Sequence, residues 1–390
     1  MDMNILEIIK KHTMQIVLVL VVIFFTITTQ GRMFEASSFN SLITQNAYVY
    51  VLAIGMLMCM LIKGNIDLSV GSVVCFIDAI GAQLMVNKGV PVLVAMLVML
   101  VVGVAIGAVL GWVIAYLNIP PWIATLAGFL AFRGLGTAIV GQNGSIGGIP
   151  ESFINLFNGT VPDFFKIPGF NLTCLLVGII GAIVFVILQI RARANKIKKG
   201  YEAESMNALI VRCVILCAVI ILFAVKLAMY KGIPLTLVWV MVIALIYNFI
   251  ISKTTIGRYF YAMGGNMEAT RLSGINTKAI LFLAYLNMQF LTVIAAWMTM
   301  ARLTSANPMA GTNFEMDAIS ACIVGGVSAY GGSGSVFGMF VGATLIGVIN
   351  IGMSLMGIDA NWQKIVKGLV LLAAVVFEIM NNRQKAKVKS

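Results

Sequence analysis

The sequence predicts an all-α polytopic membrane protein, and three observations lead to that fold class. Of the 390 residues, 61% are hydrophobic and only 10% are charged. Apolar runs of about 18 residues or more recur along the chain, which is the length that a helix needs to cross a bilayer. These runs show no strict alternation of apolar and polar residues, so they predict helices that satisfy their own backbone hydrogen bonds and exclude a β-barrel.

About 10 to 12 helices that cross the membrane or re-enter it are expected from a window of about 20 residues. The candidate spans are 13–29, 42–62, 69–86, 91–117, 121–140, 172–190, 208–228, 234–251, 278–300, 316–329, 336–356 and 363–380. The segments 69–86 and 316–329 lie beside glycine-rich stretches, so each is either a full span or a broken, re-entrant helix. If both are full spans, the two termini lie on one side of the membrane.

The basic residues indicate which loops face the cytoplasm, because Lys and Arg beside the spans are held on that side during insertion. Most of them fall on one alternation of loops: Lys10, Lys11, Lys63, Arg191, Arg193, Lys196, Lys198, Lys199, Lys253, Arg258, Arg271, Lys278, Arg383, Lys385, Lys387 and Lys389. The opposite loops carry mainly Arg32, Lys88, Lys166, Lys231 and Arg302. Both the N- and the C-terminus are therefore expected in the cytoplasm. The net charge of +12 is a topology signal and gives no reason to expect nucleic acid as a partner.

A single transmembrane permease domain over residues 1–390 is expected, because no segment outside the spans reaches the size of a domain. The longest external, periplasmic loop is 141–171, which is rich in Gly, Asn and Pro. The loop 252–277 is basic and cytoplasmic and contains helix-forming residues. We expect a soluble partner protein to bind this loop.

The chain lacks the residues that the commonest enzymatic sites need. No Gly-Lys dipeptide occurs, so a Walker A phosphate loop is excluded and the chain does not hydrolyse ATP by itself. The single histidine, His12, precedes the first span, and the six cysteines form no C-x-x-C pair. Neither a metal site, nor a cofactor, nor an enzyme activity is predicted.

Four charged residues interrupt the apolar runs: Asp67, Asp78, Arg133 and Lys367. A lone charge in hydrocarbon costs several kcal/mol, so such residues are usually paired or face a water-filled cavity. Asp67 is predicted to cap the helix that follows it, with a direct role toward the substrate as the alternative. Arg133 and Lys367 are expected to snorkel or to pair within the bundle. The role of Asp78 stays open.

Uncharged polar residues and the first helix break supply further candidates for the substrate path. Asn46, Asn287, Gln289 and Asn350 are each predicted inside a span, and Ser69 and Gly71 stand beside Asp67 at the break. Hydrogen bonding between helices is the alternative role of the amide side chains.

Three stretches of the sequence resemble motifs of the permease subunits of bacterial monosaccharide ABC importers. They are residues 64–72 (GNIDLSVGS), the loop with Gly257-Arg258, Gly264-Gly265-Asn266, Glu268-Ala269 and Arg271 to Ile275, and residues 324–335. The likeness is closest to the xylose and multiple-sugar branch of the ribose-type permease family. Shorter matches at 119–120, 131–134 and 362–368 support it, and the resemblance runs in the same order over most of the chain.

The resemblance implies that the cytoplasmic loop is the coupling helix that docks into a separate ATPase subunit. The residues to which it assigns this role are Gly264, Gly265, Asn266, Glu268, Arg271, Leu272, Ser273 and Gly274. Thr270 and Met263 differ from the residues that the family pattern favours, but neither change prevents a short helix. Asn65 departs from the commoner Gly or Glu in the first motif, so no role is assigned to it.

We therefore expect the permease subunit of an importer for xylose or a related aldose in the bacterial inner membrane. An extracytoplasmic sugar-binding protein would deliver the sugar, a cytoplasmic ABC ATPase would drive transport, and two copies of the permease would form a homodimer within membrane lipid. The alternative is an ion-coupled secondary transporter of a small neutral solute. That class would use intramembrane carboxylates, such as Asp67 and Asp78. It would also show an internal repeat, and residues 66–82 are weakly similar in sequence to residues 333–343.

Overall fold

The computed structural model describes residues 13–141, 144–201 and 205–389, with side chains omitted at 377–378 and 381–389. Lys10 and Lys11, on which the predicted side of the N-terminus rests, lie outside the described residues. The elements in chain order are α2 (Thr13–Thr28), η1 (Arg32–Phe34), α3 (Ala36–Leu61), α4 (Val70–Ala82), η2 (Gln83–Asn87), α5 (Val92–Ala115), α6 (Pro121–Val140), β1 (Ile146–Gly147), α7 (Glu151–Asn158), α8 (Leu172–Lys198), α9 (Met206–Ala228), α10 (Leu235–Lys253), α11 (Thr255–Leu272), α12 (Thr277–Leu303), β2 (Ser305–Ala306), α13 (Phe314–Val324), α14 (Val336–Leu355) and α15 (Ala360–Lys389).

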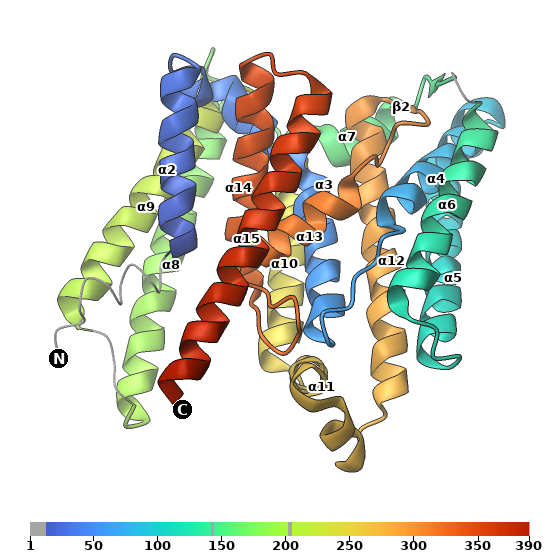
Figure 1. Ribbon diagram of the computed structural model, residues 1–390. Coiled ribbons are helices and arrows are strands. Elements are labelled where there is room, and N and C mark those ends of the chain that lie inside the picture. Colours follow the sequence, from blue (N-terminus) through green and yellow to red (C-terminus); the bar gives the residue numbers. More distant parts are fainter. Residues whose placement is uncertain (1–12, 142–143, 202–204, 390) are drawn as a thin grey trace.

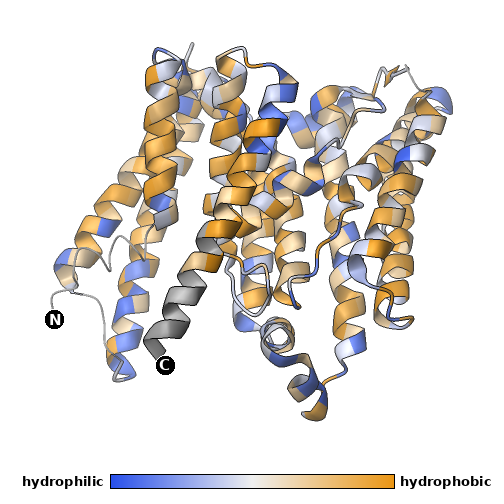
Figure 2. Ribbon diagram, viewed as in Figure 1, coloured by the Kyte–Doolittle hydropathy of each residue, from blue (hydrophilic) through white to orange (hydrophobic). Residues whose placement is uncertain are grey.

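The predicted all-α polytopic membrane fold is confirmed. Within the described residues, nine helices are long and apolar enough to cross a membrane, and α2 is a shorter apolar helix. Hydrophobic residues dominate the middle of the helices, whereas hydrophilic residues gather at the upper and lower ends (Figure 2). This banding is what a bilayer imposes, because only apolar side chains match the hydrocarbon region.

The two segments whose crossing the sequence left open differ in length. Helix α4 continues directly into the π-helix η2, and together they form an apolar stretch of 18 residues. Helix α13 has 11 residues, which at 1.5 Å per residue span about 17 Å, or roughly half of the hydrocarbon thickness. It ends at Gly325 and Gly326, the second of which has a φ of +83°. Of the two alternatives left open for 316–329, this length fits a broken, re-entrant helix and is too short for a full span.

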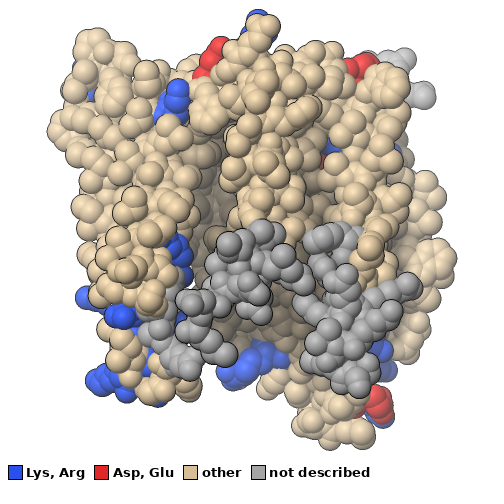
Figure 3. Space-filling model, turned by 60° about the vertical axis from the view of Figure 1, so that its left-hand side comes forward, with Lys and Arg blue, Asp and Glu red and all other residues tan. Residues whose placement is uncertain are grey.

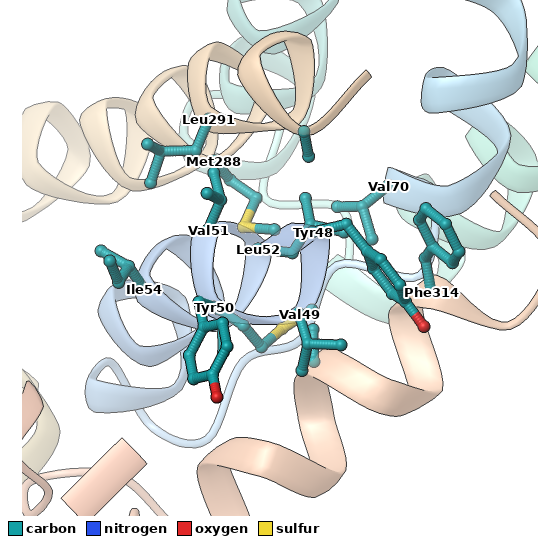
Figure 4. Close-up of a cluster of buried hydrophobic side chains, with 14 of the residues drawn as sticks. Tyr48, Val49, Tyr50, Val51, Leu52, Ile54, Val70, Met288, Leu291 and Phe314 are labelled. Atoms are coloured by element: carbon teal, nitrogen blue, oxygen red, sulfur yellow. The ribbon is translucent and has the colours of Figure 1, made fainter. Parts of the chain in front are cut away.

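Helix α3 is the axis of the bundle. In its most apolar window 89% of the residues are buried, compared with 17% in α8 and in α9. It packs against α10, α12, α13 and α14, and Figure 4 shows side chains of α12 and the ring of Phe314 gathered around it. Gly55 permits the close approach of α12, since a Cβ there would lie 2.6 Å from Met288 Sδ. The α8–α9 pair, by contrast, lies at the periphery (Figure 1).

The two ends of the bundle carry different elements. Helix α11, the C-terminal end of α15 and the basic end of α8 lie at the lower end, whereas α7 and β2 lie at the upper end (Figure 1). On the face shown in Figure 3, Lys and Arg likewise gather toward the lower end. The predicted external loop 141–171 is partly ordered structure, because α7 buries Phe153 and Phe157 and the Thr236 hydroxyl donates to Phe157 O at 2.6 Å.

An ion pair ties α15 to the half-helix α13. Lys367 Nζ lies 2.9 Å from Asp317 Oδ1, and the Tyr48 hydroxyl of α3 donates to Asp317 Oδ2 at 2.6 Å. The side chain of Asp317 is 3% exposed and that of Lys367 is 21% exposed. The prediction that Lys367 pairs within the bundle is confirmed.

Replacing Lys367 by Met should therefore destabilise the folded protein by about 3 kcal/mol, because Asp317 would keep a buried charge without its cation. Thermal unfolding of the purified protein in detergent, followed by tryptophan fluorescence, measures the change. Lys364→Met on the same helix is the control, since Lys364 is exposed and its loss should change the melting temperature little. Adding Asp317→Asn to Lys367→Met should restore much of the stability, and a double variant no better than Lys367→Met would contradict the pairing.

Candidate functional site

Helix α11, the predicted coupling element, projects from the lower end of the bundle (Figure 1). It consists of two helices joined by a kink, because Asn266 inside it has a φ of −155° and a ψ of 102°. Asn266 Oδ1 accepts a hydrogen bond from Ala269 N at 2.9 Å and so caps the second helix, as Asn commonly does at this position. The short helix predicted for this loop is thus present as the second half of a longer, bent one.

The second half of α11 presents a charged and apolar surface to solvent. Arg271 and Glu268, three residues apart, form an ion pair with an N–O distance of 2.5 Å, and both side chains are more than 60% exposed. The hydrogen bond from Arg271 lowers the pKa of the Glu268 carboxyl, and the same bond raises the pKa of Arg271. Leu272 beside them is 77% exposed. An exposed ion pair adds little to the stability of the fold, so this surface is available to a partner.

Most of the predicted coupling residues share this exposed surface. Those exposed are Gly265, Asn266, Glu268, Arg271, Leu272, Ser273 and Gly274. Gly264 differs from them, because it is half-buried and faces the bundle. A Cβ on Gly264 would lie 2.0 Å from Leu61 O and 2.2 Å from Gly332 N. The backbone of α11 therefore rests directly on the last residue of α3 and on the loop before α14.

The contact of α11 belongs to a group of backbone contacts that we call the glycine junction, comprising residues 61–64, Gly264 and residues 329–334. Gly332 N donates to Leu61 O at 3.0 Å. The Tyr261 hydroxyl of α11 donates to Gly334 O at 2.8 Å. A Cβ on Gly64, which has a φ of +69°, would lie 1.9 Å from Ala329 O. The closest contacts between the three segments are thus made by backbone atoms, with no room for a side chain at Gly64 and Gly264.

Three residues beyond the glycine junction, the chain reaches the first helix break. In Figure 1 the segment between α3 and α4 rises from the lower end of α3 toward the middle of the bundle, where α4 begins. The segment after β2 comes from the upper end and leads into α13. The N-termini of α4 and α13 meet at two glycines: a Cβ on Gly71 would lie 2.1 Å from Gly311 O, and a Cβ on Gly311 would lie 2.0 Å from Gly71 O.

Asp67 is held at this break by three hydrogen bonds. Its Oδ1 accepts from Ser69 N at 2.9 Å and from Ser69 Oγ at 2.6 Å, and its Oδ2 accepts from Gln289 Nε2 at 2.8 Å. The prediction that Asp67 caps α4 is wrong, because Ser69 occupies the cap position and no side chain accepts from the first turn. The carboxylate instead closes a turn before the helix and links it to α12.

Glu315 in the first turn of α13 is the functional candidate that the sequence reasoning missed. It is 4% exposed, and its Oε2 lies 2.4 Å from the position that a Cβ on Gly71 would occupy. It stands at the edge of an apolar run, just before the predicted span, where an intramembrane carboxylate is itself a signal of function. Both carboxylates, those of Asp67 and Glu315, lie at helix N-termini, where the helix dipole favours negative charge.

We call the residues gathered here the helix-break cluster: Asp67, Ser69, Gly71, Gln289, Gly311 and Glu315. Two acceptor atoms in it have no hydrogen-bond partner among the described residues, Gln289 Oε1 and Glu315 Oε2. Ser72 Oγ in the next position of α4 lacks one as well. Unpaired polar atoms are rare in buried positions, so their concentration at one place points to a function.

Two further intramembrane charges lie on α4 and α6. Arg133 donates to Pro308 O at 2.9 Å and to Ala310 O at 2.7 Å, so the predicted role of Arg133 within the bundle is confirmed. These bonds hold the segment that leads into α13. Asp78 is fully buried, and neither of its carboxylate oxygens has a hydrogen-bond partner in the described part of the chain.

The remaining path candidates do not join the helix-break cluster. Asn350 Nδ2 donates to Asn46 Oδ1 at 3.3 Å, and Asn46 Nδ2 donates to Leu42 O of its own helix. The Tyr247 hydroxyl donates to Asn287 Oδ1. These three amides therefore make contacts between helices, which is the alternative role expected for polar residues in spans.

Comparison with known proteins gives a consistent result over nearly the whole chain. The family model described as "Branched-chain amino acid transport system / permease component" matches residues 38–375. The xylose transport system permease protein of Haemophilus influenzae is 33% identical over 382 residues, covering 96% of this chain and 97% of the relative. The corresponding protein of Escherichia coli is 34% identical over 374 residues, with 94% and 91% covered. The ribose import permease protein of Escherichia coli is 43% identical over 148 residues, 38% of this chain and 46% of the relative. No solved structure matches.

Two glycine variants test whether the backbone contact of α11 matters. Gly264→Ala should greatly reduce substrate uptake by cells, because its Cβ would push α11 away from Leu61 and Gly332. Gly181→Ala on α8 adds the same methyl group where nothing lies within 4 Å, so it should leave uptake near the level of the unmodified protein. Uptake is measured at matched amounts of membrane-inserted protein. Equal uptake by the two variants would show that the glycine junction does not transmit movement from α11 to the membrane bundle.

Proposed function

The chain belongs to the family of permease components of branched-chain amino acid transport systems, and we propose that it is the membrane permease of an ABC importer for xylose or a related aldose. The sugar is proposed from the relatives named for xylose, which align over more than 90% of their own length. Such a permease is a multi-pass protein of the bacterial inner membrane. The alternative of an ion-coupled secondary transporter finds no support among these relatives.

The observation that carries the proposal is the position of α11. Its second half exposes the ion pair of Glu268 and Arg271 to solvent, while Gly264, just before the kink, rests on the glycine junction. A membrane bundle without an ATP site must receive energy from another subunit. A bent helix with one half exposed and the other in contact with the bundle is suited to receive it.

The mechanism that follows is a mechanical connection from the ATPase to the helix break. Movement of the ATPase subunits displaces α11, and α11 moves the glycine junction. From Gly64 only Asn65 and Ile66 separate this junction from Asp67, so a displacement there reaches the N-terminus of α4. Nucleotide-driven closure then shifts the bundle between two packings, as ligands do in other two-state proteins.

The proposed partners bind at opposite ends of the bundle. A cytoplasmic ABC ATPase binds the exposed half of α11. An extracytoplasmic sugar-binding protein docks at the end of the bundle that carries α7 and β2. Two copies of the permease, each a single membrane domain, would match two ATPase subunits. A neutral sugar needs polar and aromatic groups along its path and no buried counter-charge.

Membrane lipid is the proposed environment of the peripheral α8–α9 pair. An apolar groove of about 660 Å³ lies between these helices, lined by residues such as Ile190, Leu209 and Cys213, with Lys198 at its end. The basic residues at the end of α8 suit the anionic headgroups of the cytoplasmic leaflet. This arrangement agrees with an orientation in which α11 and the C-terminus face the cytoplasm.

Replacing both Glu268 and Arg271 by Ala should abolish coupling while the bundle stays folded. The pair is exposed and contributes little to the fold, so a large effect on transport must come from a partner interface. The reconstituted importer should lose sugar-stimulated ATPase activity and uptake together. Lys196→Ala with Lys199→Ala removes two charges from the other basic loop and serves as the control. Normal import by the Glu268/Arg271 variant would show that α11 is an ordinary solvated connection.

The orientation is tested by labelling single introduced cysteines in intact cells, in a variant without the six native cysteines. Asn276→Cys, after α11, should be protected from a reagent that cannot cross the membrane, because the basic loops are held inside. Glu151→Cys, at the start of α7, should react. The opposite pattern would overturn the cytoplasmic assignment of α11.

A further inference from the structure

We propose that the helix-break cluster is a sugar-binding site, in which Glu315 and Gln289 accept hydrogen bonds from hydroxyl groups of the passing monosaccharide. This inference rests on the proposed import function. It assigns the contact to the place where α4, α12 and α13 meet, and not to the coupling residues of α11.

The first step of the argument is the arrangement of the two side chains. Gln289 is 0% exposed, and its amide nitrogen donates to Asp67 Oδ2 at 2.8 Å and to Ser69 Oγ at 3.1 Å. These bonds fix the amide, so that Oε1 is the end left without a partner. Glu315 Oε2 lies against Gly71 in the same region and also has none. Both unpartnered atoms are acceptors, which cannot satisfy each other.

The second step is the chemistry that such a site demands. Leaving a buried acceptor unpaired costs about 1–3 kcal/mol, so a ligand that brings donors gains this free energy. A monosaccharide carries several hydroxyl donors on one small ring. A hydroxyl that donates to the Glu315 carboxylate would form a charge-assisted hydrogen bond, which is about twice as strong as a neutral one.

A sugar fits the cluster better than a cation does. The described residues contain no group of three or more His, Cys, Asp and Glu side chains that could hold a metal ion. The carboxylates of Asp67 and Glu315 are placed at the N-termini of α4 and α13, so the positive ends of two helices already offset part of their charge. A ligand of the cluster therefore has to supply hydrogen-bond donors and does not have to supply a positive charge.

The third step is access. The cluster is buried, so α4 and α13 must separate to admit a sugar. At the point where they meet, the backbones of Gly71 and Gly311 touch, and only Glu315 Oε2 and Val74 Cβ lie close beside them. Asp67 at this contact is joined to the glycine junction by a short segment, so the same displacement of α11 that drives transport could open the cluster.

The experiment uses the assembled importer, with its ATPase and binding protein, in liposomes. Glu315→Gln and Gln289→Leu are each expected to reduce the maximal rate of xylose uptake about 10-fold when loaded binding protein is saturating. Thr299→Val, on α12, is the matched control for Gln289→Leu, because the Thr299 hydroxyl is bonded within its own helix, to Ala295 O at 2.8 Å.

A set of monodeoxy xyloses separates a direct contact from a packing defect. Removing the one hydroxyl that meets Glu315 should slow uptake by the unmodified importer, and should slow the Glu315→Gln variant by a smaller factor, because the Gln amide oxygen accepts a weaker hydrogen bond than the carboxylate. Independent, multiplicative effects of every hydroxyl and the variant would overturn the contact, as would variants that import xylose at the normal rate. Sodium dependence that disappears in Glu315→Gln would overturn it in favour of an ion site. An unmodified importer that carries no aldose would instead refute the proposed function itself.

Discussion

The meeting of two helix N-termini inside the bundle is the constraint on which the rest of the structure depends. Each N-terminus presents backbone N–H groups without partners in its own helix, and hydrocarbon offers none. The carboxylates of Asp67 and Glu315 lie at these ends, and Arg133 holds the carbonyls of the segment that leads into α13. Gly71 and Gly311 are required there because the two backbones touch.

The same constraint explains why helix α3 is so completely buried. A broken helix cannot face lipid at its break, so intact helices must surround it. Helices α3 and α12 do this, with Gln289 of α12 bonded to Asp67 and Tyr48 of α3 bonded to Asp317 of the half-helix α13. The α8–α9 pair contains no break, and its exposed apolar surface needs no such cover.

Close glycine backbone contacts, together with the buried side chains of Phe260 and Met263, connect α11 to this centre. Such contacts are short and stiff, so a displacement at Gly264 is not absorbed by the rotation of side chains. The same kind of contact, between Gly71 and Gly311, leaves few atoms to be separated when α4 moves away from α13. In the proposed mechanism, coupling and opening both depend on close glycine contacts, at the glycine junction and again at Gly71 and Gly311.

The sequence alone was sufficient for the fold class, for the boundaries of most spans and for a helix in the loop 252–277, because these depend on local composition and on a contiguous motif. Glu268 could be placed beside Arg271, since helical spacing fixes which neighbours meet, whereas the kink at Asn266 appears only in the structure. Lys367 and Arg133 could be expected to find partners, because unpaired charges are costly in the membrane.

Only the tertiary structure decided which polar residues meet. Gln289 and Asp67 are separated by 222 residues, and nothing in local sequence distinguishes Gln289 from Asn287, which bonds elsewhere. Glu315 became a site candidate because its side chain lies against Gly71 of another helix. Helix α13 is short because Gly325 and Gly326 follow its last residue. The physical reason is that hydrophobic periodicity records which residues are buried, whereas the pairing of buried polar groups is set by helices that are distant in the chain.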